Sequence, residues 1–336
     1  MGVSQLKKTL SIIVPSYNTQ DYIDECLPTL LGSDTNDSVE IILVNDGSTD
    51  STREKAEQYA SLYPNTVRVV NKENGGHGSC LNVGIRVARG RYFRVVDGDD
   101  WVDEIAFSNY VNYLENADSD IVICDYAIRF VNTRRTKTIK YGMGTGAFDF
   151  NTVASKIKQI TIQSMTIRTS ILRENDISFT ENCFYEDSEF ILYPLMHVKR
   201  ISFVDCCVYQ YRMGASSQSV NIKNVVRNRE MLHQIMISLI EFGQQERTRV
   251  DESVCQYLDS VVVSRIQNYY GLILKMPYGN EAKHLIDLVN HELKEKYPVY
   301  YELSNNGAIS LLRKHNDLTY PAAYLAFGVK RFIRGF

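Results

Sequence analysis

The feature that most constrains the fold of this chain is an alternation of short apolar runs with helical stretches in its first 125 residues. The apolar runs are rich in Val and Ile and have the length of buried strands; they are Leu10–Val14, Val39–Val44, Val67–Val70, Tyr92–Val96 and Asp120–Cys124. Stretches that favour helix lie between most of them, at Asp21–Leu31, Ser51–Tyr63 and Ser79–Ala88. This alternation predicts an α/β fold with a doubly wound, mostly parallel sheet.

The pattern changes near residue 221, beyond which strand signals become rare. Apolar residues then recur at helical spacing, in Val225–Phe242, Val250–Leu274, Asn280–Lys296 and Tyr320–Phe336. We therefore expect two domains, an α/β domain over residues 1–220 and an α-helical module over residues 221–336. The many tyrosines of the helical module could pack on an acceptor sugar or on a partner subunit, although for any single one of them the core of a small bundle is the favoured position.

Charge and cysteine content narrow the class of protein. The chain has 37 Lys and Arg against 40 Asp and Glu, so it has no general positive field for nucleic acid. Seven cysteines without a CxxC pair suit neither a disulfide framework nor a zinc site, which favours a cytoplasmic protein with reduced thiols. No apolar run approaches the ~18 residues of a membrane span. The basic segment Tyr320–Phe336 could contact the inner face of a membrane peripherally, but packing on the helical module or a second subunit is favoured.

In a parallel sheet, ligands bind beyond the carboxyl ends of the strands, so the residues that follow each strand are candidates for chemistry. The first strand is followed by Pro15, Tyr17 and Asn18, and the second by Asp46 in a turn. The Asp46 carboxylate could accept the imide N–H of uracil, while Pro15 and Tyr17 form an apolar wall beside the ring. A plain turn and helix cap over Asp46–Ser48 is the alternative.

Three carboxylates follow the fourth strand within four residues, at Asp97, Asp99 and Asp100. Like charges held so close repel one another unless a cation or solvent relieves them. Hard oxygen ligands suit Mg²⁺ or Mn²⁺, and one or two carboxylates plus substrate phosphates commonly hold Mg²⁺. The alternative is a solvated acidic loop that caps the next helix.

Taken together, the segments IIVPSYN, EIILVNDGSTDST, GSCLNVGIRVARGRYFRVVDGDD and FYEDSEF resemble, in this order and spacing, the family 2 glycosyltransferases with the GT-A fold. The resemblance is strong over residues 10–125 and recognisable to about Ser219. It implies an inverting transferase that uses a nucleotide-diphosphate sugar and Mn²⁺ or Mg²⁺. By position, it implies that Asp46 contacts the uracil, Asp97 the ribose side of the nucleotide and Asp99 the metal. Further donor-binding residues expected on this basis are Pro15, Tyr17, Asn18, Asn82, Gly98, Arg212 and Ser217.

One departure from the family concerns the helix that follows the third strand. The family commonly has Ala-Arg-Asn where this chain has Cys80-Leu81-Asn82, so a positive charge near the nucleotide is missing. The preceding Asn74–Gly78 segment is rich in glycine and lets the backbone approach a ligand closely. His77 in this segment could supply the missing contact, but a solvated loop histidine is the interpretation that we favour.

Inverting transfer needs one base that removes the proton of the acceptor hydroxyl, opposite the departing diphosphate. Glu186 and Asp187 begin a helical run in FYEDSEF. The resemblance makes Asp187 the base and Glu186 the second candidate. Without the resemblance, both acids would only be expected to favour a helix N-terminus.

The segment Tyr209–Arg212, followed by Ser216–Ser219, resembles the part of the family that closes over the diphosphate. Arg212 and the serine hydroxyls could then neutralise charge on the leaving group. A strand with a solvated arginine, followed by a serine-rich loop, is the alternative.

These observations favour an enzyme that moves a hexose from UDP-glucose, UDP-galactose or an N-acetyl form to a hydroxyl of a glycan or glycoprotein. A homo-oligomer would be compatible with the sequence. A sugar-nucleotide nucleotidyltransferase would need a basic glycine-rich loop after the first strand, which Ser16–Gln20 lacks. A non-catalytic sugar-nucleotide-binding or scaffold protein is disfavoured by the complete set of acids.

Overall fold

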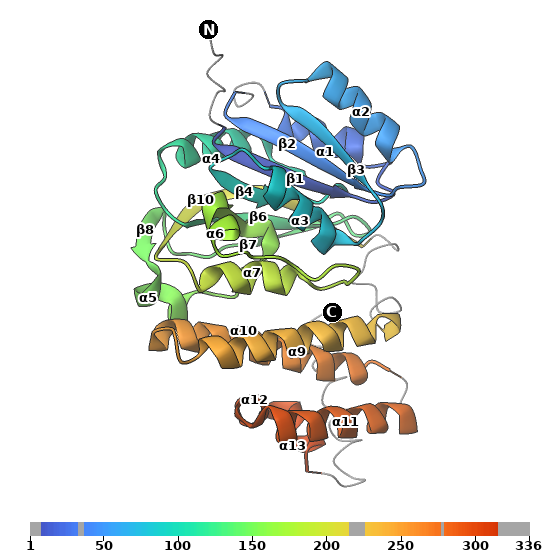
Figure 1. Cartoon of the computed structure of the whole chain (residues 1–336), viewed down its shortest axis with the longest axis vertical. Coiled ribbons are helices and arrows are strands. Elements are labelled where there is room, and N and C mark those ends of the chain that lie inside the picture. The colour runs from blue at the N-terminus through green and yellow to red at the C-terminus, as the bar shows by residue number, and fades with distance from the viewer. Residues whose placement is uncertain (1–7, 33–36, 215–225, 277–278, 315–336) are drawn as a thin grey trace. The chain divides into compact units, whose positions relative to one another are not determined.

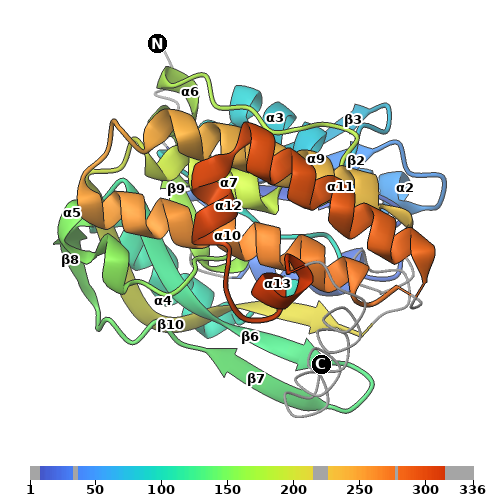
Figure 2. The same ribbon diagram turned by 90° about the horizontal axis from the view of Figure 1, so that it is seen from below.

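The computed structural model describes residues 8–32, 37–214, 226–276 and 279–314 (Figures 1 and 2). The chain divides into two compact units, Met1–Ser216 and Ser217–Phe336. This division lies close to the boundary expected at residue 220. Each unit is described separately below.

The first unit is built on a ten-stranded sheet. Its first half is parallel, in the order β3-β2-β1-β4, and consists of β1 (Leu10–Ser16), β2 (Val39–Asp46), β3 (Val67–Lys72) and β4 (Tyr92–Val95). The intervening helices are α1 (Ile23–Leu30), α2 (Thr52–Leu62) and α3 (His77–Val87). Ile12 belongs to the core that includes α1, while Ile13 lies against Gly84 of α3. Helices therefore cover both faces of β1, which explains its uninterrupted apolar sequence and confirms the predicted α/β fold.

The second half of the sheet contains antiparallel strands. The short strand β9 (Met165–Arg168) pairs antiparallel with both β4 and β6 (Ile121–Phe130), and β10 (Arg200–Met213) runs parallel to β6. The remaining elements of this unit are β5 (Trp101–Val102), α4 (Glu104–Asn116), β7 (Arg135–Ile139), β8 (Gly146–Asp149), α5 (Phe150–Val153), η1 (Ala154–Lys156), η2 (Ile162–Ser164), α6 (Thr169–Glu174) and α7 (Asp187–Leu195). The apolar pattern does not predict β9, because four residues are too few to display a periodicity.

The second unit is helical in the parts that the structure describes. It contains α9 (Arg229–Glu246), α10 (Glu252–Ile273), α11 (Asn280–Lys296), α12 (Pro298–Leu303) and α13 (Gly307–Leu312). Most of the tyrosines that the sequence suggested for acceptor binding are buried in this unit, namely Tyr257, Tyr269, Tyr270, Tyr297 and Tyr300. These rings belong to the core and offer little surface for stacking on a sugar. The expected helix over Tyr320–Phe336 lies outside the described residues.

None of the helices in the described ranges is long and apolar enough to cross a membrane. All seven cysteines fall within those ranges, and each is free of a disulfide bond.

Candidate active site

The loops that follow β1, β2 and β4 contact one another at the carboxyl edge of the parallel strands. The side chain of Asn18 accepts a hydrogen bond from the Thr49 N–H at 2.8 Å, and the Gly98 N–H donates to the Pro15 carbonyl at 3.1 Å. A Cβ atom on Gly98 would lie only 2.5 Å from the Ser16 hydroxyl oxygen, so glycine allows this close approach. The structure therefore brings together Pro15, Asn18 and Gly98, as their positions at strand ends predict.

Tyr17 and Asp46 differ in their accessibility at this edge. Tyr17 is 52% exposed, so its ring is available to a ligand. The Asp46 carboxylate is buried, and it accepts hydrogen bonds from Lys72 Nζ at 2.6 Å, the Gly75 N–H at 2.9 Å and the Gly76 N–H at 2.8 Å. An ionised carboxylate has about four acceptor positions. Asp46 thus orders the glycine-rich loop and retains acceptor capacity on the oxygen that Gly76 contacts.

The three acids of the turn after β4 have different surroundings. Asp100 is buried and accepts hydrogen bonds from the Tyr209 hydroxyl at 2.6 Å and the Arg212 N–H at 2.7 Å. Burial, followed by the nearby charges of Asp99 and Asp97, raises its pKa well above the ordinary range. Asp97 is partly exposed, and although desolvation opposes its ionisation, its hydrogen bond to His77 lowers its pKa. The carboxylates of Asp100 and Asp97 therefore already have hydrogen-bond partners within the protein.

Asp99 is the acid of this turn that is suited to a metal ion. Its carboxylate accepts no side-chain hydrogen bond from the described residues, and burial and the charge of Asp97 raise its pKa to about 6. Such a carboxylate gains when a cation replaces its proton. The described part of the chain contains no group of three or more His, Cys, Asp or Glu side chains that could hold a metal. A metal at Asp99 would therefore need oxygen ligands from a substrate or from water, which is common for Mg²⁺.

Arg212 lies beside the acidic turn. Its Nε donates to the Asp99 carbonyl at 2.7 Å, and its guanidinium carbon lies 4.6 Å from the centre of the Trp101 ring and 4.9 Å from that of Tyr22. A terminal nitrogen also contacts Glu25 at 2.5 Å. The side chain is only 13% exposed, so the alternative of a solvated arginine is wrong. Ser217, the other residue expected near the diphosphate, lies outside the described residues.

Glu186 and Asp187 stand at the start of α7, but only one of them is available. The Glu186 carboxylate is buried, and one oxygen lies 2.6 Å from His77 Nδ1. Asp187 is partly exposed, and its carboxylate accepts a 3.3 Å hydrogen bond from the neighbouring Ser188 hydroxyl. The preceding residue, Tyr185, has a positive φ of 79°, which is strained for a bulky side chain. Asp187 is thus the carboxylate that could reach an incoming hydroxyl.

His77 is the first residue of α3 and connects two of these acids. Its Nδ1 lies 2.6 Å from Glu186 Oε1, and its Nε2 lies 2.9 Å from Asp97 Oδ1. The interpretation of His77 as a solvated loop histidine is therefore wrong. The sequence provided no signal for this contact, because Glu186 is 109 residues away.

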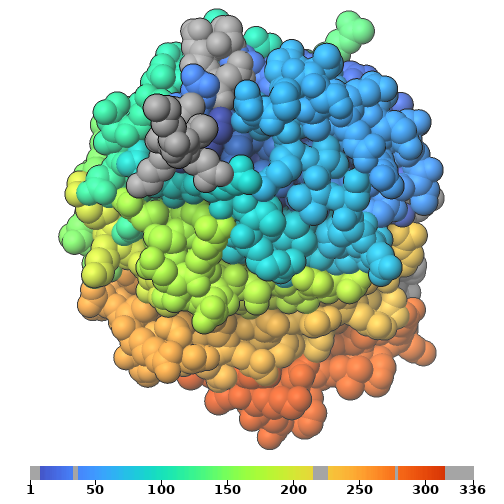
Figure 3. All heavy atoms as spheres, turned by 45° about the horizontal axis from the view of Figure 1, so that its top comes forward, coloured from blue at the N-terminus to red at the C-terminus, as the bar shows by residue number. Residues whose placement is uncertain are grey.

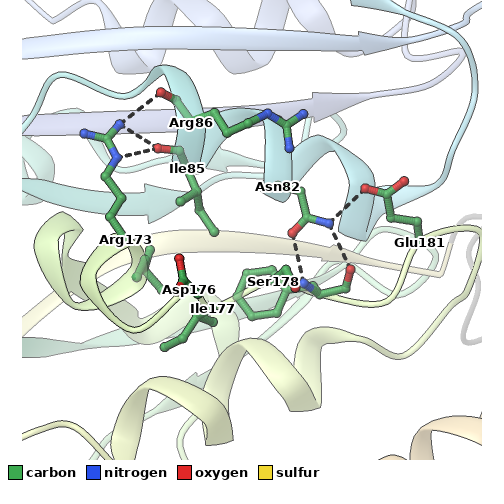
Figure 4. Close-up of a pocket in the computed structure, with 10 residues that line it drawn as sticks. Asn82, Ile85, Arg86, Arg173, Asp176, Ile177, Ser178 and Glu181 are labelled. Carbon is green, nitrogen blue, oxygen red and sulfur yellow. Dashed lines mark hydrogen bonds between the residues drawn. The ribbon is translucent and has the colours of Figure 1, made fainter.

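Asn82 lies on α3 and is hydrogen-bonded to the segment that precedes α7. Its side-chain amide donates to the Phe179 carbonyl and accepts from the Phe179 N–H, both at 2.9 Å. Together with Glu181 it lines a pocket of about 690 Å³ beside α3 and α6, where Arg173 binds the carbonyl of Ile85 (Figure 4). These bonds attach residues 179–181 to α3. A donor-binding role for Asn82 stays a prediction, and its observed contacts are structural.

The chain that leads into α7 and the glycine-rich segment Asn74–Gly78 approach one another in the first unit. In Figure 3 the cyan surface of residues near 75–90 borders the yellow-green surface of residues near 180. The Asn182 N–H donates to the Gly75 carbonyl at 2.6 Å. This contact brings the chain that leads into α7 to the carboxyl edge of the sheet.

Lys72 is a site residue that sequence reasoning missed, and the sequence did not indicate the contacts that Tyr209 makes with the acidic turn. Besides its bond to Asp100, the Tyr209 hydroxyl lies 3.1 Å from Asp97 Oδ2. Lys72 is the last residue of β3 and neutralises Asp46. The position of Lys72 at a strand end was an available signal. The contacts of Tyr209 with Asp97 and Asp100 had no such signal in the sequence, because they depend on the pairing of β10 with β5.

The observed sheet is mixed rather than mostly parallel, because β5, β7, β8 and β9 pair antiparallel with their neighbours. Its parallel strands end in acids at their carboxyl edge, an arrangement that is typical of nucleotide-binding α/β proteins. Residues 11–176 match the family model described as Glycosyl transferase family 2. Residues 11–176 therefore form a family 2 glycosyltransferase domain.

Similar proteins agree with this assignment. The chain is 33% identical over 216 residues to "Uncharacterized glycosyltransferase EpsJ" of Bacillus subtilis (strain 168), a match that covers 62% of each protein. It is 24% identical over 270 residues to "Poly(ribitol-phosphate) beta-N-acetylglucosaminyltransferase TarS" of Staphylococcus aureus (strain Mu50 / ATCC 700699), which covers 79% of this chain and 46% of TarS. Both matches thus span less than two thirds of the relative.

Solved structures show the same fold. The crystal structure of S. aureus TarS 1-349 in complex with UDP-GlcNAc has a TM-score of 0.68 at 20% identity and covers 97% of this chain and 92% of that chain. The mannosyltransferase PcManGT from Pyrobaculum calidifontis, in complex with GDP-Man and Mn²⁺, has a TM-score of 0.51 at 17% identity and covers 97% and 87%. The predicted GT-A fold is thereby confirmed.

Proposed function

We propose that this protein is an inverting glycosyltransferase that moves a hexose from a UDP-sugar to a hydroxyl of a glycan or glycoprotein. The observation that carries the proposal is that Asp46, Asp99 and the start of α7 lie in one unit and that their carboxylates have different surroundings. The family match argues against a nucleotidyltransferase. A relative named as a poly(ribitol-phosphate) glycosyltransferase and the TarS complex with UDP-GlcNAc support UDP-glucose, UDP-galactose or an N-acetyl form as donor.

In this proposal the nucleotide binds beyond the ends of β1 and β2. The remaining acceptor position on Asp46 takes the imide N–H of uracil, and the exposed ring of Tyr17 covers one side of the base. Asn18 and Gly98 order the loops around it, and Asp97 faces the ribose. Because the carboxylate can only accept, it favours a base that presents an N–H in this position.

The cation that we propose is Mn²⁺ or Mg²⁺, held by Asp99. The bound cation would offset negative charge on the diphosphate as it leaves. Asp99 fits this role because it is the acid of the turn that is not occupied by a side-chain donor. Arg212 lies against the same turn and adds a fixed positive charge.

Transfer itself requires one displacement at the anomeric carbon. Asp187 accepts the proton of the acceptor hydroxyl while that oxygen forms its bond to the sugar carbon. The bond from this carbon to the diphosphate breaks, and UDP leaves with the electron pair on the opposite face. The single displacement inverts the configuration at this carbon.

Nucleotide binding tests the donor part of the proposal. Calorimetry with Mn²⁺ is expected to give at least about tenfold tighter binding of UDP than of CDP, which corresponds to ~1.4 kcal/mol, because cytosine carries no N–H at the position of the uracil imide. Equal affinities, or binding of UDP that does not depend on Mn²⁺, would contradict the assignment of the base and metal sites.

We further propose that the helical unit serves acceptor or partner binding rather than donor binding. A shortened protein that ends at residue 216 is therefore expected to retain UDP binding and to lose transfer to its acceptor or its oligomeric state. Circular dichroism must first show that this protein is folded. Full transfer by a folded truncation with an unchanged oligomeric state would rule out both roles.

A further inference from the structure

His77 joins two acids that lie in distant parts of the sequence. It contacts Glu186 at 2.6 Å through Nδ1 and Asp97 at 2.9 Å through Nε2. The Glu186 side chain is only 4% exposed, and its second carboxylate oxygen, Oε2, is buried without a hydrogen-bond partner in the described structure. The His77 contact is therefore the hydrogen bond that the structure gives to this buried carboxylate.

The two contacts need two donated protons. Ionised carboxylate oxygens only accept hydrogen bonds, and a neutral imidazole carries one N–H. Burial disfavours a charged imidazole, but the hydrogen bonds and charges of Asp97 and Glu186 raise the pKa of His77 well above its ordinary value. An imidazolium that donates to both acids satisfies the geometry.

The two acids flank the groups to which we assign chemistry. Asp97 precedes the metal candidate Asp99 by two residues, and Glu186 directly precedes the base candidate Asp187. The backbone also packs tightly at this point, since a Cβ atom on Gly78 would lie 2.2 Å from the Thr180 carbonyl oxygen. His77 thus connects the turn that would hold the donor with the first turn of α7.

We propose that His77 is a positioning residue for glycosyl transfer, which holds Glu186 so that the first turn of α7 keeps Asp187 directed at the bound donor. The inference rests on the proposed function. His77 acts through Glu186 and does not touch the reacting atoms. Its loss leaves a buried carboxylate without its partner, and Glu186 then moves toward water and takes the start of α7 with it.

The test compares the variants His77→Ala and Glu186→Gln with their double variant. Displacement of a catalytic group by about 1 Å can cost about 100-fold, so His77→Ala is expected to lower kcat for UDP release by about 10- to 100-fold. The Kd for UDP with Mn²⁺ should change less than about threefold, because Asp46 and Asp99 are untouched and Asp97 keeps its hydrogen bond from the Tyr209 hydroxyl. The double variant should be no slower than the slower single variant, because both changes break the same link. His197→Ala, at an exposed position just beyond α7, is the control and should leave both constants unchanged.

Three outcomes would overturn the inference. The first is a normal kcat in His77→Ala, and the second is additive losses of kcat in the double variant. The third is an equal loss of kcat and of UDP affinity in His77→Ala, together with a lowered midpoint of urea unfolding, because this would show a general structural role. If the wild-type protein releases UDP from no donor, the proposed function has failed. Amide hydrogen exchange then tests whether the contact between His77 and Glu186 stabilises the first turn of α7. Exchange at Glu189 and Phe190, whose N–H groups bond the Glu186 carbonyl, should become faster in His77→Ala but not in His197→Ala; unchanged exchange would refute the link.

Discussion

Replacement of Asp187 by Asn is expected to lower kcat for sugar transfer by about 10²–10⁴-fold, the usual cost of removing a general base. The amide keeps the size of the side chain but cannot accept the proton of the acceptor hydroxyl. Within the part of the chain that the structure describes, the hydrogen-bond partner of the Asp187 side chain is the neighbouring Ser188 hydroxyl, so the fold should be unaffected. Donor affinity should therefore remain near that of the wild type.

Two controls make this result specific. Glu186→Gln should lose less activity than Asp187→Asn, because we assign Glu186 a supporting part. Glu174→Gln, at an exposed position in α6, should have no effect. Near-normal transfer by Asp187→Asn together with an inactive Glu186→Gln enzyme would reverse the assignment of the base.

Replacement of Asp99 by Asn is expected to abolish the part of UDP binding that depends on Mn²⁺, with a loss of affinity of at least about 100-fold. Loss of an outer contact around a metal already costs about 10- to 100-fold, and Asp99 would be a direct ligand. The change also removes a carboxylate whose pKa is raised to about 6 by burial and by Asp97. The metal-free protein should therefore be no less stable than the wild type, because a destabilised charge has been deleted.

Calorimetry with UDP, with and without Mn²⁺, measures this effect directly. Asp118→Asn, which removes a carboxylate at a side chain that is 80% exposed, is the matched control and should bind as the wild type does. An unchanged affinity of Asp99→Asn for UDP-sugar in the presence of Mn²⁺ would exclude Asp99 as the metal ligand.

The parallel part of the fold could be predicted because its information is local. The run from Leu10 to Val14 is buried on both faces and contains only apolar residues and one buried serine, so its pattern identifies a central strand. The same logic placed Asp46 and Asp97 at strand ends before any contact was known. By contrast, β9 has four residues and owes its position to pairing with β4 and β6, which no local pattern encodes.

The sequence predicts which residues belong to the candidate site better than it predicts which groups they contact. The sequence indicated Asp99 and Asp187, and the structure leaves these two carboxylates the least occupied by other groups. It did not indicate that His77 bridges Asp97 and Glu186, or that aromatic rings enclose Arg212. These contacts join segments about 20 to 190 residues apart, as the sequence numbers show, and they depend on the packing of loops rather than on a repeating pattern.

The central claim is that this chain transfers sugar from a UDP-sugar with inversion. The most direct measurement incubates the protein and Mn²⁺ with UDP-glucose, UDP-galactose and their N-acetyl forms, and follows UDP release together with the anomer of the released sugar by proton NMR. We predict release from at least one of these α-linked donors, with the β-anomer as the first product, and loss of this release in Asp187→Asn. A folded protein that releases no UDP from any of them with or without a hydroxyl acceptor, or that first forms the α-anomer, would contradict the account.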